Sequence, residues 1–451
     1  MLTILYGILG LGLIVLIHET GHLIAARMCG VKVEAFSVGM GPILLHKTIK
    51  DTDYRLSLIP LGGYCEMKGE KAFSEALESN AKEITGEPDS LYGVHPLKRA
   101  FIAFMGPFFN VIFAFFAFII ISAIGYNYYS TPSKIILANE VYPDFSSPAA
   151  EAGLKTGDTI YQIDEEPIIN FADISSYVSL HPDEELVFKV LRDNKDLSFV
   201  VKTELDTETG AGKIGVLNWV NPLVAEVIPD SSAANMGLSA GATITKVDGE
   251  PVFNTTDISL LITGKNSVVM EWEKDSNIFS GTLDLNTGDV GIRFASDRYH
   301  TPTYGFFGSI KQGFLETIET IGLTFKSIGL LFKGVDFTSA VSGPIRITQM
   351  IGETAVSGFS ASFSTGIVTV LNFLALISIS LFIMNLLPIP ILDGGLILFA
   401  LIETISRRKI HPKVLYYVQF IGLAFIAVLF CIALFSDFRY LFNRQKWEKE
   451  A

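Results

Sequence analysis

Residues 16–22 read LIHETGH and place three ionisable side chains inside a run of apolar residues. On a helix, His18 and His22 are four residues apart and share one face, so both imidazoles can reach the same metal ion. Glu19 lies beside them and can handle a proton. The pattern predicts part of a catalytic zinc site, which takes three protein ligands and leaves a fourth position for water. One ligand is therefore still to be found.

The same pattern has two simpler interpretations. It can arise by chance, or the two histidines can be satisfied by hydrogen bonds from neighbouring helices. An ionisable group near the centre of a membrane helix costs about 2.5–3.5 kcal/mol and is rarely kept without a function. The apolar surroundings of residues 18–22 therefore favour the metal site.

The composition indicates a membrane protein with a soluble part. Of the 451 residues, 49% are hydrophobic, and the mean hydropathy is +0.42. Four apolar runs approach or exceed the ~20 residues that a membrane-spanning helix needs; they lie at about 2–25, 100–125, 366–391 and 414–435. The first run lacks a basic segment before it and a small-residue cleavage site, so we expect a retained helix rather than a signal peptide.

The negative charge is concentrated in one region. The net charge is −13, yet residues 131–300 hold 27 Asp and Glu against 12 Lys and Arg, a net of −15. Such an acidic part argues against nucleic-acid binding, which needs a basic face. The three cysteines, Cys29, Cys65 and Cys431, lie far apart, so the sequence implies neither a disulfide framework nor a cysteine-based zinc site.

The acidic region contains an internal repeat. Ser147–Ser175 aligns without gaps on Ser231–Ser259, with 15 identities in 29 positions. The shared pattern AAxxGLxxGxxI resembles bacterial PDZ domains, small β-barrels that hold an extended peptide at a sheet edge. Because Asp158 of the first copy becomes Ala242 in the second, the two copies need not do the same job. Peptide binding and a role as spacer or steric filter both remain open.

The expected fold class is therefore mixed: a polytopic α-helical membrane protein with four transmembrane helices and two tandem, β-rich PDZ domains inserted between the second and third. The expected domains are a first transmembrane helix at 1–27, a β-hairpin and loop region at 28–99, a second transmembrane helix at 100–126, PDZ domains at 131–210 and 211–295, an amphipathic helix at 303–333, a third transmembrane helix at 366–405 and a fourth at 414–436.

Basic residues predict the orientation of the spans. Lys98 and Arg99 precede the second span, and Arg407, Arg408 and Lys409 lie between the third and the fourth. By the positive-inside rule both loops are cytoplasmic, so the acidic region and both termini are outside.

Three segments outside the spans have predicted structures. Residues 31–38 and 54–67 alternate apolar and polar side chains around turns that include Gly62 and Gly63, which predicts short strands. An exposed strand edge there could pair with an unwound substrate, although a simple connecting hairpin is equally consistent. Residues 70–95 are polar and predict a surface loop. Residues 303–333 predict an amphipathic helix that lies on the outer membrane surface or packs on the repeated domains.

The missing ligand is expected in the third span. Residues 385–395 read NLLPIPILDGG, and Asp393 is the only acidic residue between Glu353 and Glu403. Pro388 and Pro390 break the helix, and broken backbone in a membrane is tolerated where protein buries it or water fills a cavity. His18 is ~16 residues, or about 24 Å, into a helix that runs from outside to inside, and by parity the third span runs the same way.

The second span contains a further polar residue. Residues 106–110 read GPFFN, and Asn110 could hydrogen-bond across helices or orient a substrate.

Together, HExxH, GPxxN, the repeated domains and NxxPxPxLDGG resemble the site-2 protease family of intramembrane zinc metalloproteases. The resemblance implies that Zn²⁺ is bound by His18, His22 and Asp393 and that Glu19 is the catalytic base. It further implies that the freed backbone of the substrate is held by the residues Asn385, Asn110, Gly62, Gly63, Pro388 and Pro390.

The resemblance also implies a biological setting. The protein would lie in the bacterial inner membrane, with periplasmic PDZ domains and an active site near the cytoplasmic face. Its substrates would be single-pass membrane proteins already trimmed outside, notably an anti-sigma factor of an envelope stress response, and remnant signal peptides. Partners would thus be these substrates, the lipid bilayer and peptides at the PDZ domains.

Two alternatives from other classes are a membrane metal transporter and a membrane-anchored PDZ scaffold. A transporter would use His and Asp within helices but would not need Glu19 as a base. A scaffold would not need the predicted metal site.

Overall fold

The computed structural model describes residues 2–207, 209–286, 290–330 and 342–450. The chain forms two compact units. The first combines the chain up to Tyr126 with the chain from Thr301 onward, and the second holds Asn127–His300. Each is described by itself.

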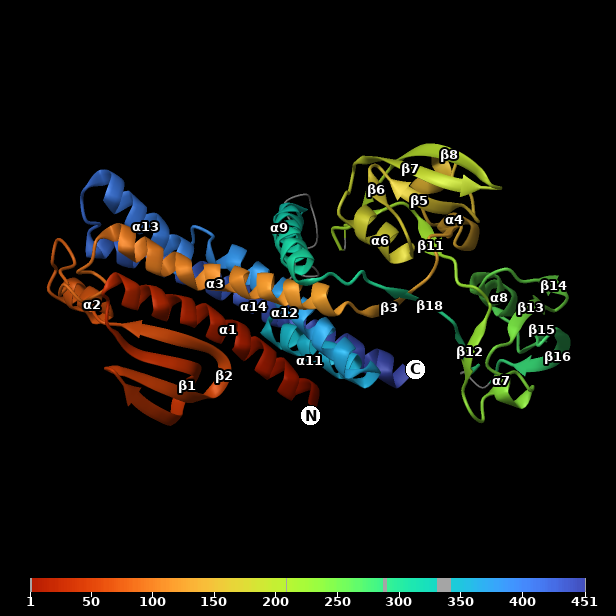
Figure 1. Cartoon of the computed structure of the whole chain (residues 1–451), viewed down its shortest axis with the longest axis horizontal. Coiled ribbons are helices and arrows are strands. Elements are labelled where there is room, and N and C mark those ends of the chain that lie inside the picture. The colour runs from red at the N-terminus through yellow and green to blue at the C-terminus, as the bar shows by residue number, and fades with distance from the viewer. Residues whose placement is uncertain (1, 208, 287–289, 331–341, 451) are drawn as a thin grey trace. The chain divides into compact units, whose positions relative to one another are not determined.

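The first unit is mainly helical (Figure 1). Its elements are α1 (Leu2–Cys29), β1 (Val33–Ile49), β2 (Thr52–Met67), α2 (Glu70–Glu78), α3 (Pro96–Ile124), α9 (Phe306–Leu330), α11 (Pro344–Ala361), α12 (Phe363–Asn385), α13 (Asp393–Ser406) and α14 (Pro412–Glu450). Among the described residues, four helical segments are long and apolar enough to cross a membrane, namely Leu2–Cys29, Pro96–Ile124, Phe363–Asn385 and Pro412–Tyr440. The four expected apolar helices are thus confirmed.

The third span is interrupted at the predicted break and forms two helices. The helix α12 ends at Asn385, and α13 begins at Asp393. Proline has no N–H to donate, so Pro388 and Pro390 prevent the helix from continuing. Gly394 lets the start of α13 lie close to the end of α12, because a Cβ at this position would overlap the Leu386 carbonyl. The break therefore sets Asp393 in the first turn of a new helix.

Small residues allow α1 to lie against its neighbours. A Cβ at Gly21 would overlap the Met105 carbonyl of α3, and a Cβ at Gly7 would overlap the Thr348 carbonyl of α11. Small side chains let helix backbones approach closely where lipid gives no hydrophobic driving force. Helix α1 is thus packed between α3 and α11, and α11 was not predicted from the sequence.

The region after α1 forms a β-hairpin longer than the short strands predicted at 31–38 and 54–67. Strand β1 continues through residues 39–49, because Gly39 and Gly41 take positive φ angles of 88° and 81° that let the strand bend rather than end. Residues 35–38 partner both residues 53–56 and residues 63–66 of β2. The last part of β2 packs against α1, as Figure 1 shows.

The polar surface loop predicted at 70–95 is confirmed only in part, because residues 79–95 are irregular and mostly exposed but the first residues form a helix. Helix α2 occupies Glu70–Glu78, and the segment is anchored by apolar side chains. Ala76 and Ile84 are buried in a cluster with Leu415, and Phe73 and Tyr92 pack against it together with Phe399. These contacts attach the segment to α13 and α14. They could not be predicted, because the few apolar residues that make them are scattered through a polar stretch.

The amphipathic helix predicted at 303–333 corresponds to α9, and residues 331–333 lie outside the described residues. Within the helical unit, helix α9 packs against α3 and α12. Its packed face combines the buried Ser309 and Thr317 with Ile321 and Ile328, which contact the core between α3 and α12, while Phe307 and Phe314 are exposed. Large apolar side chains of α9 are therefore exposed on the surface of this unit, as on a face in contact with lipid.

In the second unit the two copies of the sequence repeat form two modules with corresponding elements. The unit contains β3 (Asn127–Ser130), β4 (Ile135–Leu137), α4 (Ala138–Val141), α5 (Pro148–Glu151), β5 (Thr159–Ile163), β6 (Glu166–Pro167), α6 (Phe171–Ser179), β7 (Glu185–Arg192), β8 (Lys195–Lys202), β9 (Glu204–Leu205), β10 (Gly212–Lys213), β11 (Val216–Asn218), β12 (Val224–Val227), α7 (Ser232–Asn235), β13 (Thr243–Val247), β14 (Glu250–Pro251), α8 (Thr255–Ile262), β15 (Ser267–Lys274), β16 (Asn277–Asp284), β17 (Ile292–Phe294) and β18 (Asp297–His300). The first module has a sheet of order β6-β5-β7-β8 and the second one of order β14-β13-β15-β16. Each module has its own apolar core.

The two modules differ where Asp158 becomes Ala242. Asp158 is buried and accepts two hydrogen bonds from Arg192, at 2.6 Å from Nε and 2.7 Å from Nη2. In the second module Lys274 instead donates to Ser239 Oγ at 2.8 Å. The substitution therefore exchanges one internal polar contact for another.

We expect Asp437 to stabilise the helical unit. This fully buried carboxylate of α14 accepts hydrogen bonds from the backbone N–H groups of Gly343 at 2.8 Å and Ile345 at 3.0 Å, at the start of α11. Asp437→Ala removes this cap and should lower the free energy of unfolding by about 0.5–2 kcal/mol, measured by thermal unfolding in detergent. The matched control is Arg439→Ala at an exposed position of the same helix. Equal melting temperatures for the two variants would contradict the assignment.

Candidate metal centre

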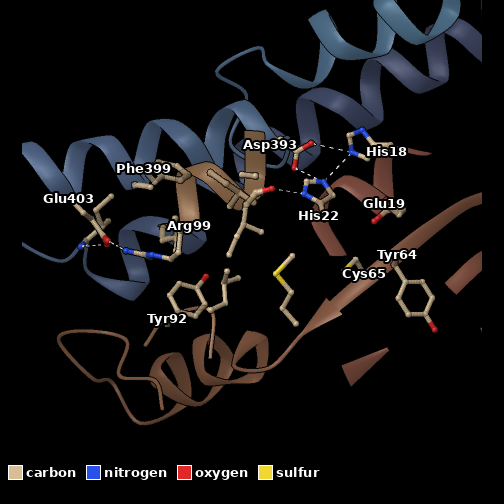
Figure 2. A pocket seen from close by; sticks show the side chains of 18 of the residues that line it. His18, Glu19, His22, Tyr64, Cys65, Tyr92, Arg99, Asp393, Phe399 and Glu403 are labelled. Carbon is tan, nitrogen blue, oxygen red and sulfur yellow. Dashed lines mark hydrogen bonds and ion pairs between the residues drawn. The ribbon is translucent and has the colours of Figure 1, made fainter. Parts of the chain in front are cut away.

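Three side chains from two helices meet in the helical unit (Figure 2). His18 Nε2 lies 3.3 Å from Asp393 Oδ2, and His22 Nε2 lies 3.4 Å from Asp393 Oδ1. The two Nε2 atoms are 3.2 Å apart. All three donor groups lie within 4.8 Å of one another, which is the arrangement of a site able to hold one metal ion. The structure thus brings together the residues that the sequence predicted as ligands.

The close approach of α1 and α3 positions His22. A Cβ at Gly106 would overlap the His22 ring, so the glycine of the GPFFN stretch makes room for the imidazole. His22 Nδ1 lies 2.9 Å from the Ile102 carbonyl oxygen of α3, which accepts its hydrogen bond. Because the proton is then on Nδ1, Nε2 keeps a lone pair for a metal.

Asn110 contacts His18. Of the two roles predicted for it, a hydrogen bond across helices and the orientation of a substrate, this contact favours the first. Its Nδ2 lies 3.3 Å from His18 Nδ1. In this orientation Asn110 Oδ1 is buried without a hydrogen-bond partner among the described residues. A half-turn of the amide places Oδ1 where it can accept the proton of His18 Nδ1, which leaves Nε2 of His18 with its lone pair.

Glu19 faces the last part of β2. A Cβ at Gly63 would lie 3.3 Å from Glu19 Cγ and 2.7 Å from the Ser37 carbonyl, so a glycine is needed where β2 passes the carboxylate. The backbone N–H of Cys65 donates a hydrogen bond to Glu19. The carboxylate is thereby held beside the metal ligands without joining them.

The other predicted residues lie in different parts of this region. Asn385 ends α12, is half-buried and makes no side-chain hydrogen bond among the described residues. Pro388 is exposed and Pro390 is half-buried, where a Cβ at Gly422 of α14 would contact it. Gly62 precedes Gly63 on β2 and takes a φ of 124°. None of the four contacts the three ligands directly.

A cavity of about 300 Å³ opens beside the three ligands. It also reaches Arg99 of α3 and Glu403 of α13. From the sequence, Arg99 was used only to predict the orientation of the spans, and Glu403 only as the acidic residue that follows Asp393. Arg99 and Glu403 are 304 positions apart in the sequence, so no local pattern could predict that they pair.

An HExxH helix and a carboxylate from a second helix, set among four apolar helices, define the class of membrane-embedded metallopeptidases. The sequence profile described as "Peptidase family M50" matches residues 6–429. The chain belongs to peptidase family M50, the family of the site-2 proteases.

The relatives agree with this family. The proteins named "Putative zinc metalloprotease" from Treponema pallidum (strain Nichols) and Borreliella burgdorferi are 42% and 32% identical to this chain over 98% of its length, and the alignments cover 100% and 99% of those proteins. The regulator of sigma-E protease RseP of Escherichia coli (strain K12) is 33% identical, with 96% of this chain and 97% of that protein covered.

Zinc is the cofactor that this family implies, and the residues fit it. Two imidazole nitrogens and a carboxylate oxygen are ligands that zinc prefers, and three protein ligands leave a position for water. The fit is supported by the second hydrogen bond of each histidine, to the Ile102 carbonyl and to Asn110, because such partners orient the ligand nitrogen toward the metal.

We predict that Asn110 supports zinc binding through His18. Asn110→Leu should weaken zinc affinity by about 10–100-fold, because the His18 ring loses its hydrogen bond. Asn110→Asp keeps an oxygen acceptor and should retain most of the affinity. The measurement is competition with a chromophoric chelator, and the outcome against us is equal affinity in the Leu variant and the wild type.

Proposed function

We propose that this protein is a zinc endopeptidase that cleaves single-pass transmembrane proteins within the membrane, with His18, His22 and Asp393 as zinc ligands and Glu19 as the catalytic base. The observation that carries the proposal is the meeting of the three ligands, at 3.3 and 3.4 Å between imidazole and carboxylate atoms, beside the Glu19 carboxylate.

The proposed chemistry divides between the metal and Glu19. When bound, zinc acidifies a water molecule and polarises the scissile carbonyl. Glu19 accepts the proton from the water and delivers it to the amine that leaves, while the Cys65 N–H fixes its orientation. The hydrogen bonds on Nδ1 of both histidines keep their Nε2 atoms directed to the centre.

The substrate must be extended before its backbone can react, because a helix hides its carbonyl groups in hydrogen bonds. Residues 63–67 of β2 line the cavity beside Glu19, and among the described strands they pair only with β1. We propose that their other edge binds the unwound substrate as an added strand. We propose that Asn385, whose amide makes no hydrogen bond among the described residues, binds the freed backbone, and that Gly62, Pro388 and Pro390 shape the approach of the substrate.

The repeated modules are proposed to be PDZ domains that select substrates already trimmed outside. The first module has a cavity of about 350 Å³ between α6 and the β10–β11 segment, lined by Phe171, Ile174 and Leu217 among others. A groove between a helix and a strand is where such domains bind an extended peptide. The second module shares the sheet order of the first. We propose that it acts mainly by its size.

The proposed setting is the bacterial inner membrane, with the modules in the periplasm and the zinc site toward the cytoplasm. The charge pattern supports this orientation, because Arg99 and the basic run 407–409 lie at the same end of the helical unit as the cavity. An anti-sigma factor of an envelope stress response and remnant signal peptides are the proposed substrates, supported by the named relative RseP.

We predict that Glu19→Gln abolishes cleavage but not zinc binding. Loss of a general base should reduce the rate by about 10²–10⁴-fold, measured with purified protein and a single-pass model substrate in detergent. The control, Glu316→Gln, changes a carboxylate on α9 that bonds Gln312 away from the site. Chelation should stop cleavage by the wild type. Full activity of Glu19→Gln would refute the mechanism, and a metal transporter would show metal uptake that is unaffected by this variant.

We predict that the modules impose substrate selection. Ser130 of β3 and Asp297 of β18 are paired, so residues 131–296 can be replaced by a two-residue Asn-Gly turn without stretching the chain. The shortened protein should cleave a substrate that keeps its folded outer domain as fast as the trimmed one, whereas the full chain should cleave only the trimmed substrate. Retained discrimination in the shortened protein would refute the filter.

A further inference from the structure

The cavity beside the zinc ligands extends well beyond them. It runs along α13 from Asp393 to Glu403, ten residues or about 15 Å at 1.5 Å per residue. On α3 it is lined from Ala103 to Arg99. Figure 2 shows Arg99 and Glu403 facing each other on the side of the cavity away from His18. The cavity is therefore longer than the chemistry at the metal requires.

The walls between these two ends are apolar. Ile102 and Ala103 of α3 are buried there, and Phe399 and Ala400 contribute from α13. Met67 of β2 closes another side. A volume of about 300 Å³ equals that of the smaller ligand sites in proteins, which are mostly apolar. Such a space holds a large side chain, and its lining between Asp393 and the Arg99–Glu403 pair contains no charged residue.

The far end is closed by an ion pair. Arg99 Nη2 donates to Glu403 Oε2, and the second oxygen of Glu403 accepts the Ile410 N–H at 2.9 Å. The side chains are only 17% and 10% exposed, and the Arg99 guanidinium lies over the Tyr92 ring at 5.5 Å from its centre. Arg99 Nε is buried without a hydrogen-bond partner among the described residues, but the pair as a whole carries no net charge. A third charge entering the cavity would therefore be buried without a counter-ion, at a high cost.

We infer that this cavity is a subsite for one large apolar side chain next to the scissile bond, and that the Arg99–Glu403 pair makes it reject charged side chains. The inference rests on the proposed protease function and deepens it. Arg99 and Glu403 act as specificity residues, remote from the reacting atoms, and the pair sets the depth of the subsite.

The test changes the charge at the closed end. A single-pass model substrate is prepared with Leu, Ala, Glu or Lys at each position that flanks the cleaved bond. At one of these positions the wild type should prefer Leu to Ala by about tenfold or more and should cleave the Glu and Lys substrates poorly. Glu403→Gln leaves the Arg99 cation unpaired, so the rate for Glu relative to Leu should rise at that position by about tenfold or more.

Reciprocal variants make the test specific. Arg99→Met leaves the Glu403 carboxylate alone and should favour Lys instead of Glu. The double variant Arg99→Met with Glu403→Leu has neither charge and should keep the preference for Leu. The control is Glu316→Gln, which removes a carboxylate of α9 that accepts a hydrogen bond from Gln312 outside the cavity and should leave the selectivity unchanged.

The outcomes separate this inference from the function beneath it. If the wild type cleaves none of the substrates, the proposed function fails. If the wild type cleaves them but Glu403→Gln and Arg99→Met show the same selectivity as the wild type, the proposed subsite is refuted. Should a charge variant fail to fold, Phe399→Ala gives a second test, because the enlarged subsite should raise the rate for Trp relative to Leu, and an unchanged ratio would overturn the inference.

Discussion

The contact between the imidazoles of α1 and the carboxylate of α13 is the interaction on which the helical unit depends. Burying two histidines and an aspartate among apolar helices costs free energy unless they bind a common ligand or hydrogen-bond to one another. Their donor atoms meet only because Gly21 and Gly106 let α1 approach α3 and because the break after Asn385 places Asp393 in the first turn of a new helix. A close helix crossing and a broken helix, each unfavourable alone, together create one polar centre.

The remaining buried charges of this unit follow the same rule. Glu19 accepts a backbone hydrogen bond from β2, Glu403 is held by Arg99 and by the Ile410 N–H, and Asp437 is satisfied by backbone N–H groups at the start of α11. Each carboxylate thereby joins two elements that are distant in the chain. The polar contacts connect the helices at defined points, while the apolar surfaces between them can face lipid.

Family membership and geometry support different parts of the functional conclusion. The family match and the relatives, which extend over nearly the whole chain, establish a zinc metalloprotease of the membrane. The geometry adds what a family name does not contain. It gives Asn110 a place beside His18, sets Gly63 against Glu19, and reveals a cavity with an ion pair at its end. The duplicated modules share a sheet order but differ in their internal ion pair, which is consistent with different roles.

The sequence by itself determined the features that local chemistry fixes. The spacing of His18 and His22, the four apolar runs, the proline break before Asp393 and the repeat between 147 and 259 all follow from neighbouring residues. Only the tertiary structure decided what depends on packing between distant segments. The docking of residues 70–95, the packing of α11 against α1 and the Arg99–Glu403 pair have no local signature, because the residues that make these contacts are far apart in the chain.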